Sequence, residues 1–445
     1  MPSVRSLSKI KPRFYFALHL TCTIFAFQNE SLGMKQISIT PPAKLNAHIT
    51  LPSSKSICNR ALIINALAGG DISLLSNLSD CDDTRVTLRA LQSMPAIVDI
   101  MAAGTAMRFL TAYLAATDCG SHIITGTERM KQRPIGILVN ALRQLGAEIE
   151  YTENEGFPPL KIKGKILKGD SIELPGGVSS QYISALLMTG PMFMNGLKLT
   201  LTGDIVSRPY IDMTLDLMRE YGAKAEWTAS NCLEVSPQAY KPRPYSVESD
   251  WSAASYWYEM VALSEDGRVE LPRLKEKSTQ GDAAIKDIFD KLGVKTSFEG
   301  DTAVLNKGIR TVNTLEWDFT GQPDMAQTFV VTCAMMGVTF RLSGLQSLKI
   351  KETDRMAALI TEMRKLGFVI KEHDGSVLAW DGERCQPMPD AAIDTYEDHR
   401  MAMAFAPAAI KLGDLKIKNP QVVSKSYPAF WDDLRMAGFG LTTFD

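Results

Sequence analysis

The segment ALRQLGAEIEY (141–151) predicts the end of an amphipathic helix, then a glycine, then a short strand. Three later segments share this pattern: LMREYGAKAEW (217–227), IFDKLGVKTSF (288–298) and MRKLGFVIKEH (363–373). In each, the glycine stands where a left-handed backbone conformation most easily ends a helix. We therefore expect helix-ending glycines at Gly70, Gly146, Gly222, Gly293 and Gly367.

The expected glycines recur every 71 to 76 residues. That spacing is too long for a common solenoid repeat, so it predicts a unit of mixed helices and strands used about six times. Helices and strands interleave throughout, which indicates an α/β or mixed α+β class. The length of 445 residues favours two domains. The Pro-rich tract 236–250 predicts a domain crossing near Asp250.

Composition excludes several classes of protein. A formal net charge of −2 argues against nucleic acid as the main partner. The seven cysteines are widely spaced without a C-x-x-C pair, which favours free thiols in a reducing, cytoplasmic compartment. No P-loop, Rossmann fingerprint or H-E-x-x-H motif occurs, so neither a nucleotide site nor a catalytic metal is predicted.

The first 33 residues differ from the rest of the chain. Basic residues precede an apolar run (14–27) that is too short to span a membrane and lacks a small-residue cleavage site. We favour a disordered leader or a mis-assigned start over an export signal. The globular part is expected to begin at Met34, and a chain that starts there is expected to be active.

Several predicted helices begin with polar or charged residues. The candidate positions are Ser53, Ser54, Lys55, Ser56 and Arg60; Gly104, Thr105 and Arg108; Ser179, Ser180 and Gln181; Ser207 and Pro209; Asp324 as a cap; Lys351, Glu352 and Arg355; and Asp398, His399 and Arg400. Taken singly, each is an ordinary helix cap. Together they place cations beside helix N-termini, which suits phosphates and carboxylates. The set predicts a site for multiply anionic small molecules.

These positions lie in segments that resemble, in order, the signatures of 5-enolpyruvylshikimate-3-phosphate (EPSP) synthases. The segments are LPSSKSICNRAL (51–62), AGTAMRFL (103–110), RMKQRPIG (129–136), SSQYISALLM (179–188), SRPYID (207–212), KETDR (351–355) and DHRMAMAF (398–405). The resemblance runs from Met34 to the C-terminus. It implies a two-domain, inside-out α/β fold with three βαβαββ units per domain and the active site in the cleft between them. One domain would be 53–249, and the other 34–52 plus 250–445.

The resemblance also implies a reaction. The enolpyruvyl group of phosphoenolpyruvate moves to the 5-hydroxyl of shikimate 3-phosphate, giving EPSP and phosphate on the shikimate pathway to chorismate and aromatic amino acids. No metal or organic cofactor is implied, and we expect a monomer that acts on these small molecules without a nucleic acid or membrane partner. Glyphosate, a phosphonate that competes with phosphoenolpyruvate in this family, is expected to inhibit because Gly104 is retained.

Roles carry over position by position. Shikimate 3-phosphate would be bound by Lys55, Ser56, Arg60, Ser179, Ser180, Gln181, Ser207, Tyr210, Asp324 and Lys351. Phosphoenolpyruvate would be bound by Lys55, Gly104, Arg129, Gln181, Arg355, Arg400 and Lys425, with Arg108, Ser347 and His399 nearby. Asp324 would act as the base for the hydroxyl, and Glu352 as acid and base at C3, assisted by Lys55.

Three positions depart from the family pattern, and two other functions stay open. Ala102 and Ser347 stand where asparagine is frequent, and Phe109 stands where proline is frequent. The related UDP-N-acetylglucosamine enolpyruvyl transferases carry a catalytic cysteine in a loop, whereas the region 105–118 has none and Cys119 lacks a basic neighbour. A non-catalytic binding protein on the same scaffold is the other alternative, which a turnover assay distinguishes.

Overall fold

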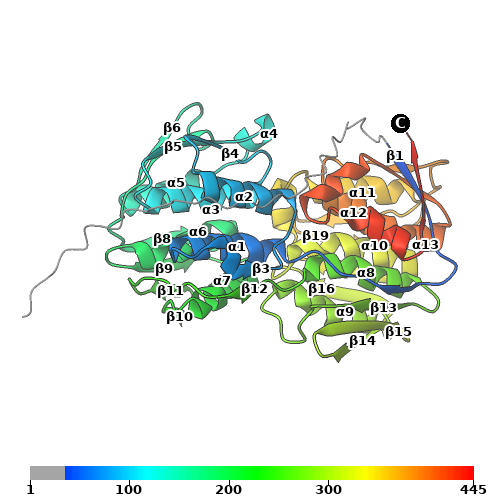
Figure 1. Ribbon diagram of the computed structural model, residues 1–445. Coiled ribbons are helices and arrows are strands. Elements are labelled where there is room, and N and C mark those ends of the chain that lie inside the picture. Colours follow the sequence, from blue (N-terminus) through cyan, green and yellow to red (C-terminus); the bar gives the residue numbers. More distant parts are fainter. Residues whose placement is uncertain (1–35, 445) are drawn as a thin grey trace, which may run out of the picture. The chain divides into compact units, whose positions relative to one another are not determined.

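The computed structural model describes residues 36–444, so the predictions about residues 1–33 lie outside the described residues. Within this range, one four-strand plan recurs in five sheets (Figure 1). Each sheet has one parallel pair of strands, followed by two antiparallel neighbours. The predicted repeat and the mixed α/β class are therefore confirmed.

Two of these sheets use strands from 97–235. The first has the order β4 (Ile97–Asp99), β5 (Ser121–Thr125), β7 (Leu160–Lys163), β6 (Glu148–Tyr151). The second has the order β8 (Ser171–Pro175), β9 (Leu197–Thr202), β11 (Cys232–Val235), β10 (Ala225–Ala229). A sixth sheet contains only β3 (Leu75–Ser76) and β12 (Tyr245–Ser246), so the sixth unit is incomplete.

The other three sheets use strands from the two ends of the described chain. Their orders are β2 (Asn46–His48), β13 (Arg268–Leu271), β15 (Thr302–Lys307), β14 (Val294–Glu299); β16 (Thr314–Asp318), β17 (Thr339–Ser343), β19 (Val377–Trp380), β18 (Lys371–His373); and β20 (Ala392–Ile393), β21 (Leu415–Lys418), β1 (Gln36–Thr40), β22 (Gly440–Phe444). Because β1 pairs with both β21 and β22, the start of the described chain is fixed beside its end.

The helices connect these strands. They are α1 (Lys55–Leu67), α2 (Asp82–Ser93), α3 (Gly104–Ala116), α4 (Glu128–Lys131), α5 (Gly136–Gln144), α6 (Ser180–Thr189), α7 (Arg208–Glu220), α8 (Trp251–Leu263), α9 (Ile285–Lys291), α10 (Ala326–Met336), α11 (Arg355–Lys365), α12 (His399–Phe405), α13 (Ala409–Leu412) and α14 (Phe430–Met436). Short 3₁₀ helices that matter for the site are η3 (Gly281–Ala284), η4 (Pro323–Met325) and η5 (Gln346–Ile350). None of the helices between residues 36 and 444 is long and apolar enough to cross a membrane.

Four of the five predicted glycines end helices as expected. Gly146, Gly222, Gly293 and Gly367 have φ of 104°, 86°, 85° and 89°, directly after α5, α7, α9 and α11. The fifth prediction, Gly70, is wrong by one residue. Gly69 has the positive φ of 67°, because α1 is capped at Ala68 and the next residue must take the left-handed conformation.

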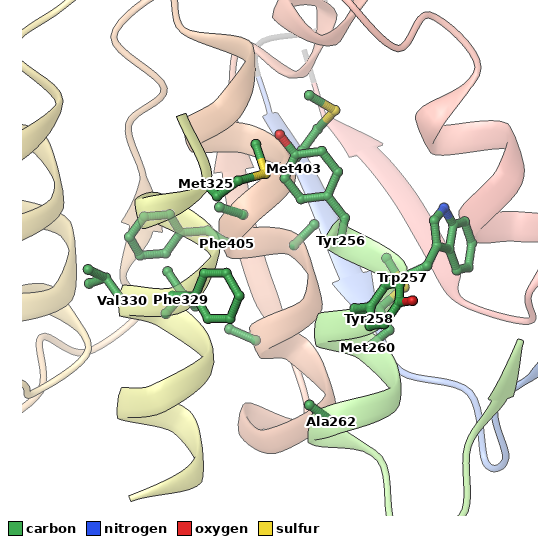
Figure 2. Close-up of a cluster of buried hydrophobic side chains, with 14 of the residues drawn as sticks. Tyr256, Trp257, Tyr258, Met260, Ala262, Met325, Phe329, Val330, Met403 and Phe405 are labelled. Carbon is green, nitrogen blue, oxygen red and sulfur yellow. The ribbon is translucent and has the colours of Figure 1, made fainter. Parts of the chain in front are cut away.

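Buried side chains form two large hydrophobic clusters. The N-terminal core draws on Ala61 to Tyr240, and the C-terminal core on Ile37 to Leu51 together with Trp251 to Phe439. Figure 2 shows part of the C-terminal core, where side chains of α8, α10 and α12 fill one apolar cluster. Each fully buried aromatic or aliphatic side chain contributes about 1.5–3 kcal/mol.

The central helices are apolar on nearly every face, which is typical of helices enclosed by other elements. In α8, every residue except Ser252 is buried. Because the faces of such helices pack in the core, their polar groups are found mainly at the helix N-termini, where they can line a cavity. The domain boundaries 53–249 and 34–52 plus 250–445 stay a prediction, supported by the division between the two cores.

The chain passes between the cores at two adjacent segments. Ser54 N donates to Glu248 O at 2.8 Å, and Asp250 N donates to Pro52 O at 2.9 Å. These bonds hold residues 52–54 and 248–250 side by side, so the tract that predicted a crossing near Asp250 ends at this pair of segments.

Candidate active site

A cavity of about 660 Å³ is lined by residues of both cores. Every residue that the family resemblance places in or beside the site lines it, except Arg129. The lining residues are Lys55, Ser56, Arg60, Gly104, Arg108, Ser179, Ser180, Gln181, Ser207, Tyr210, Asp324, Ser347, Lys351, Glu352, Arg355, His399, Arg400 and Lys425. These residues span positions 55 to 425 in the sequence, so the fold brings them together.

Helix N-termini line the wall contributed by the N-terminal core, among them those of α1, α3, α6 and α7. As predicted, α1 is capped by Ser54, whose Oγ accepts from Ile57 N at 3.4 Å. Ser179 caps α6 in the same way, accepting from Gln181 N at 3.3 Å. At α3 the capping residue is Ala103, which offers no side-chain acceptor, so the first N–H groups of this helix can bind an anion.

Arg60 is fixed by the protein itself. Its guanidinium is buried and donates to Thr214 Oγ1 at 2.7 Å, Ser184 Oγ at 3.0 Å and Ser56 O at 2.9 Å. Burial lowers the pKa of Arg60 to about 10, so it keeps its charge at neutral pH. Most of its donors join α1 to α6 and α7, and its charge contributes to the field of the cavity.

Arg355 is the centre of the wall contributed by the C-terminal core. Only 2% of its side chain is exposed, and it donates to three carboxylates. Asp398 accepts from Nε at 2.6 Å and from Nη2 at 3.2 Å, Asp324 accepts from Nη1 at 2.8 Å, and Glu352 accepts from Nη2 at 3.0 Å. Asp398 is also the expected N-cap of α12, accepting from Arg400 N at 2.9 Å.

Further cations contact the two carboxylates proposed for catalysis. Lys351 Nζ lies 3.1 Å from Asp324 Oδ1, and Lys425 Nζ lies 2.5 Å from Glu352 Oε1. The prediction that Asp324 caps a helix is wrong. Asp324 lies inside η4, and α10 begins two residues later, because its carboxylate is drawn to Lys351 and Arg355 instead.

His399 is buried beneath the cavity. Among the described residues neither ring nitrogen has a hydrogen-bond partner. Burial, followed by the charge of Lys55, holds the pKa of His399 well below its usual value, so the ring is neutral. Ser347 Oγ is likewise buried without a partner in the part of the chain that the structure describes. Both side chains line the cavity and can bond to a ligand.

The segment RMKQRPIG contributes a different arginine from the one predicted. Arg133 lines the cavity, whereas Arg129 donates to Gln132 Oε1 at 3.4 Å and to the Glu352 carbonyl at 3.5 Å outside the lining. A Cβ built on Gly104 would lie 2.8 Å from Arg133 Nη1 and 2.9 Å from Arg108 Nη1. Two guanidinium groups therefore approach the backbone at the start of α3, and a methyl group at residue 104 would require their flexible ends to shift.

Comparisons with known proteins agree with this arrangement. The sequence profile described as EPSP synthase (3-phosphoshikimate 1-carboxyvinyltransferase) matches residues 39–100 and 93–434. The chain belongs to the EPSP synthase family. A 3-phosphoshikimate 1-carboxyvinyltransferase of Bacteroides fragilis is 59% identical over 403 residues, covering 91% of this chain and 98% of the relative. One of Aliivibrio fischeri is 37% identical over 430 residues, covering 90% and 99%.

Solved EPSP synthase structures share the fold. An EPSP synthase from Acinetobacter baumannii superposes with a TM-score of 0.71 at 21% identity, covering 92% of this chain and all of that one. A second structure of the Acinetobacter enzyme gives a TM-score of 0.70. This agreement confirms the two-domain α/β fold that the sequence resemblance implied.

Charge sets the protonation of the two carboxylates in this EPSP synthase family member. Burial alone would raise the pKa of Asp324, but the charges of Lys351, Arg400 and Arg355 outweigh it and hold the pKa far below its usual value. Burial would also raise the pKa of Glu352, yet Lys425 and Arg355 hold that pKa well below its usual value. Both carboxylates are therefore ionised when no ligand is bound, because the neighbouring cations then interact with them alone.

Lys55 keeps its charge in the same field. Burial alone lowers the pKa of Lys55, but the neighbouring acidic groups, Asp83 first and Glu352 with it, outweigh burial and hold the pKa above its usual value. Asp83 also lines the cavity and was not predicted from the sequence. Asp83 lies in the first turn of α2, where acidic residues are common in any helix, so the sequence gave no indication that it belongs to the site.

Of the three departures from the family pattern, Ser347 lines the cavity, whereas Phe109 and Ala102 do not. Phe109 is buried, and the Arg60 guanidinium lies 5.2 Å from its ring centroid. Ala102 is exposed and does not line the cavity. Cys119, the residue considered for the alternative transferase family, is also absent from the lining, and burial raises the pKa of its thiol. Within residues 36–444 no group of His, Cys, Asp and Glu is placed to hold a metal ion.

Proposed function

We propose that this cavity binds shikimate 3-phosphate and phosphoenolpyruvate together and that its paired carboxylates move the protons of the transfer. Through its family the chain is a 3-phosphoshikimate 1-carboxyvinyltransferase, which transfers the enolpyruvyl group to shikimate 3-phosphate. The observation that carries the assignment of roles is the gathering of Asp324 and Glu352 among Lys351, Arg355 and Lys425.

Charge balance supports this pairing of substrates. Each substrate carries a carboxylate and a phosphate, roughly −2.5 to −3 charges near neutral pH. The lining supplies eight cationic side chains against the three carboxylates of Asp83, Asp324 and Glu352. The cations are Lys55, Arg60, Arg108, Arg133, Lys351, Arg355, Arg400 and Lys425. With helix N-termini added, the cavity offsets the repulsion that would otherwise keep the two anions apart.

The proposed chemistry needs two proton transfers in the addition step, two in the elimination step, and no other reagent. Asp324 accepts the proton of the 5-hydroxyl as that oxygen bonds to C2 of phosphoenolpyruvate, and Glu352 gives a proton to C3. In the resulting ketal phosphate, the bond from C2 to the phosphate oxygen breaks while Glu352 takes a proton back from C3. The departing phosphate takes the proton that Asp324 accepted from the hydroxyl, so both carboxylates return to their starting states.

An ionised Glu352 must first acquire the proton that it donates. Lys425 contacts one of its oxygens and lines the cavity, so an anionic substrate can share that cation. Once the positive charge is shared, the burial of Glu352 dominates and its pKa rises. Substrate binding is thereby coupled to protonation of the acid.

The direct test is phosphate release by the purified chain with both substrates present. Release that depends on shikimate 3-phosphate and phosphoenolpyruvate together supports the proposal. Tight binding of both without turnover would instead support the non-catalytic alternative. The cytoplasmic location and the monomeric state stay predictions, which fractionation and light scattering address.

Arg133 and Arg129 give the second test. We expect Arg133→Ala to raise the KM for phosphoenolpyruvate about 10- to 100-fold, because a charged hydrogen-bond donor is lost from the cavity. Arg129→Ala, outside the lining, is expected to change that KM less than about threefold, which is within the loss expected for an exposed charge. Initial rates with phosphoenolpyruvate varied measure both. The reverse order of effects would restore Arg129 as the ligand and contradict the assignment to Arg133.

Gly104→Ala is expected to weaken inhibition by glyphosate about tenfold, with a smaller rise in the KM for phosphoenolpyruvate. The new methyl group would lie 2.8 Å from Arg133 Nη1 and 2.9 Å from Arg108 Nη1, so the ends of these two side chains must shift within the site. Because glyphosate is longer than phosphoenolpyruvate, the reduced space should weaken the binding of glyphosate more than that of phosphoenolpyruvate. Inhibition constants for both proteins measure the ratio, and a wild type that glyphosate does not inhibit would contradict the prediction.

A further inference from the structure

Asp282 lies outside the cavity lining, but it contacts Tyr210, which lines the cavity, and Ser252, which lies behind the lining. It belongs to η3, and only 4% of it is exposed. Its Oδ1 accepts from the Tyr210 hydroxyl at 2.9 Å, and its Oδ2 accepts from the Ser252 hydroxyl. A buried carboxylate needs such donors, since an unpaired one is strongly destabilising.

The two hydroxyls come from helices of different cores. Tyr210 is in the first turn of α7, which packs in the N-terminal core, while Ser252 is in the first turn of α8 in the C-terminal core. The start of η3 packs tightly against the start of α7, because a Cβ on Gly281 would lie 2.4 Å from Pro209 Cβ. Glycine before Asp282 thus lets η3 touch the start of α7.

Ser252 also contacts Arg400, a residue proposed to bind substrate. Its hydroxyl hydrogen is given to Asp282, which leaves the oxygen lone pairs to accept from Arg400 Nη2 at 3.4 Å. Arg400 otherwise faces Asp324 at 3.6 Å. A chain of hydrogen bonds therefore runs from Arg400 through Ser252 to Asp282 and on to Tyr210.

We propose that Asp282 is a positioning residue that sets Tyr210 on one wall and Arg400 on the other, so that the sites for both substrates are aligned from behind the cavity. This inference rests on the proposed function, in which Tyr210 binds shikimate 3-phosphate and Arg400 binds phosphoenolpyruvate. Burial raises the pKa of Asp282 to about 6, so the carboxylate is ionised in an assay at pH 8.

Steady-state kinetics of three single variants test the inference. Asp282→Asn is expected to raise the KM for both substrates about tenfold, because neither hydroxyl keeps its charged acceptor. Tyr210→Phe is expected to raise only the KM for shikimate 3-phosphate, and Ser252→Ala only that for phosphoenolpyruvate. Asp287→Asn, which removes an exposed carboxylate from the adjacent helix α9, serves as the control and should match the wild type.

A double variant separates positioning from general damage to the fold. If Asp282 acts through Tyr210, adding Tyr210→Phe to Asp282→Asn changes the KM for shikimate 3-phosphate by less than about twofold further. Additive losses, or an Asp282→Asn enzyme with both KM values unchanged, would overturn the inference. If Asp282→Asn does not fold, the single variants Tyr210→Phe and Ser252→Ala test the inference instead. A variant of these two that raises the KM for both substrates equally would overturn the inference. A wild type without phosphate release refutes the proposed function itself.

Discussion

Glu352→Gln is expected to lower kcat by about a thousandfold while leaving the fold intact, because the amide can neither give a proton to C3 nor take one back. The variant keeps the size of the side chain and an oxygen that can accept from Arg355. Its KM values should therefore change much less than kcat, which separates a chemical role from a binding role. Phosphate release at saturating concentrations of both substrates is the measurement.

Isotope incorporation and a surface variant make the Glu352 test specific. In heavy water the wild type should place deuterium at C3, since C3 becomes a methyl group in the ketal intermediate, and Glu352→Gln should lose this incorporation. Glu128→Gln is the matched control, because the Glu128 side chain is 86% exposed. A Glu352→Gln enzyme with kcat within about threefold of the wild type would remove Glu352 from the mechanism.

Lys55→Met is expected to lower kcat/KM by about 100- to 1000-fold without unfolding the protein, because it removes the cation at the start of α1 where both substrates are proposed to meet. Methionine retains most of the apolar stem, so the packing of α1 should survive. Loss of the charge also removes a favourable neighbour of Asp83 and Glu352.

Kinetics and thermal unfolding should be measured together for Lys55→Met. Lys44→Met offers a control with the same chemical change, since Lys44 is exposed and pairs only with exposed Asp266 in the part of the chain that the structure describes. An unfolding temperature close to that of the wild type, with catalysis lost, is the expected pair of results. Catalysis that survives at substrate concentrations below KM would show that Lys55 is not at the reacting groups.

Local signals in the sequence were sufficient to predict the repeat and the positions of most helix ends. Gly146 and Gly367 follow helices with the predicted positive φ, because helix termination depends on the few residues around the glycine. Ser54 and Ser179 cap helices for the same local reason. Where the local signal was ambiguous, as in the pair Gly69 and Gly70, the prediction failed by one residue.

Side-chain direction within a motif was not predictable in this way. The segment RMKQRPIG contains two arginines, and the sequence does not say which of them faces the cavity. Arg129 lies in the short helix α4, while Arg133 follows it and approaches Gly104 of α3. That choice depends on how α4 and α3 pack, which is a tertiary property. Asp282 left no functional signal either, since its partners lie 72 and 30 residues away.

The sequence by itself determined the family, the recurring unit of mixed helices and strands, and the chemical kinds of group that the site contains. Ordered motifs and helix-ending glycines depend on nearby residues, and the amino-acid types already fix which charges are available. Only the tertiary structure decided which cation pairs with which carboxylate, that Arg355 holds three of them, and that Asp282 joins Tyr210 to Ser252. Those pairings depend on burial and on distances of a few ångströms between distant segments, and Coulomb and hydrogen-bond energies change steeply over such distances.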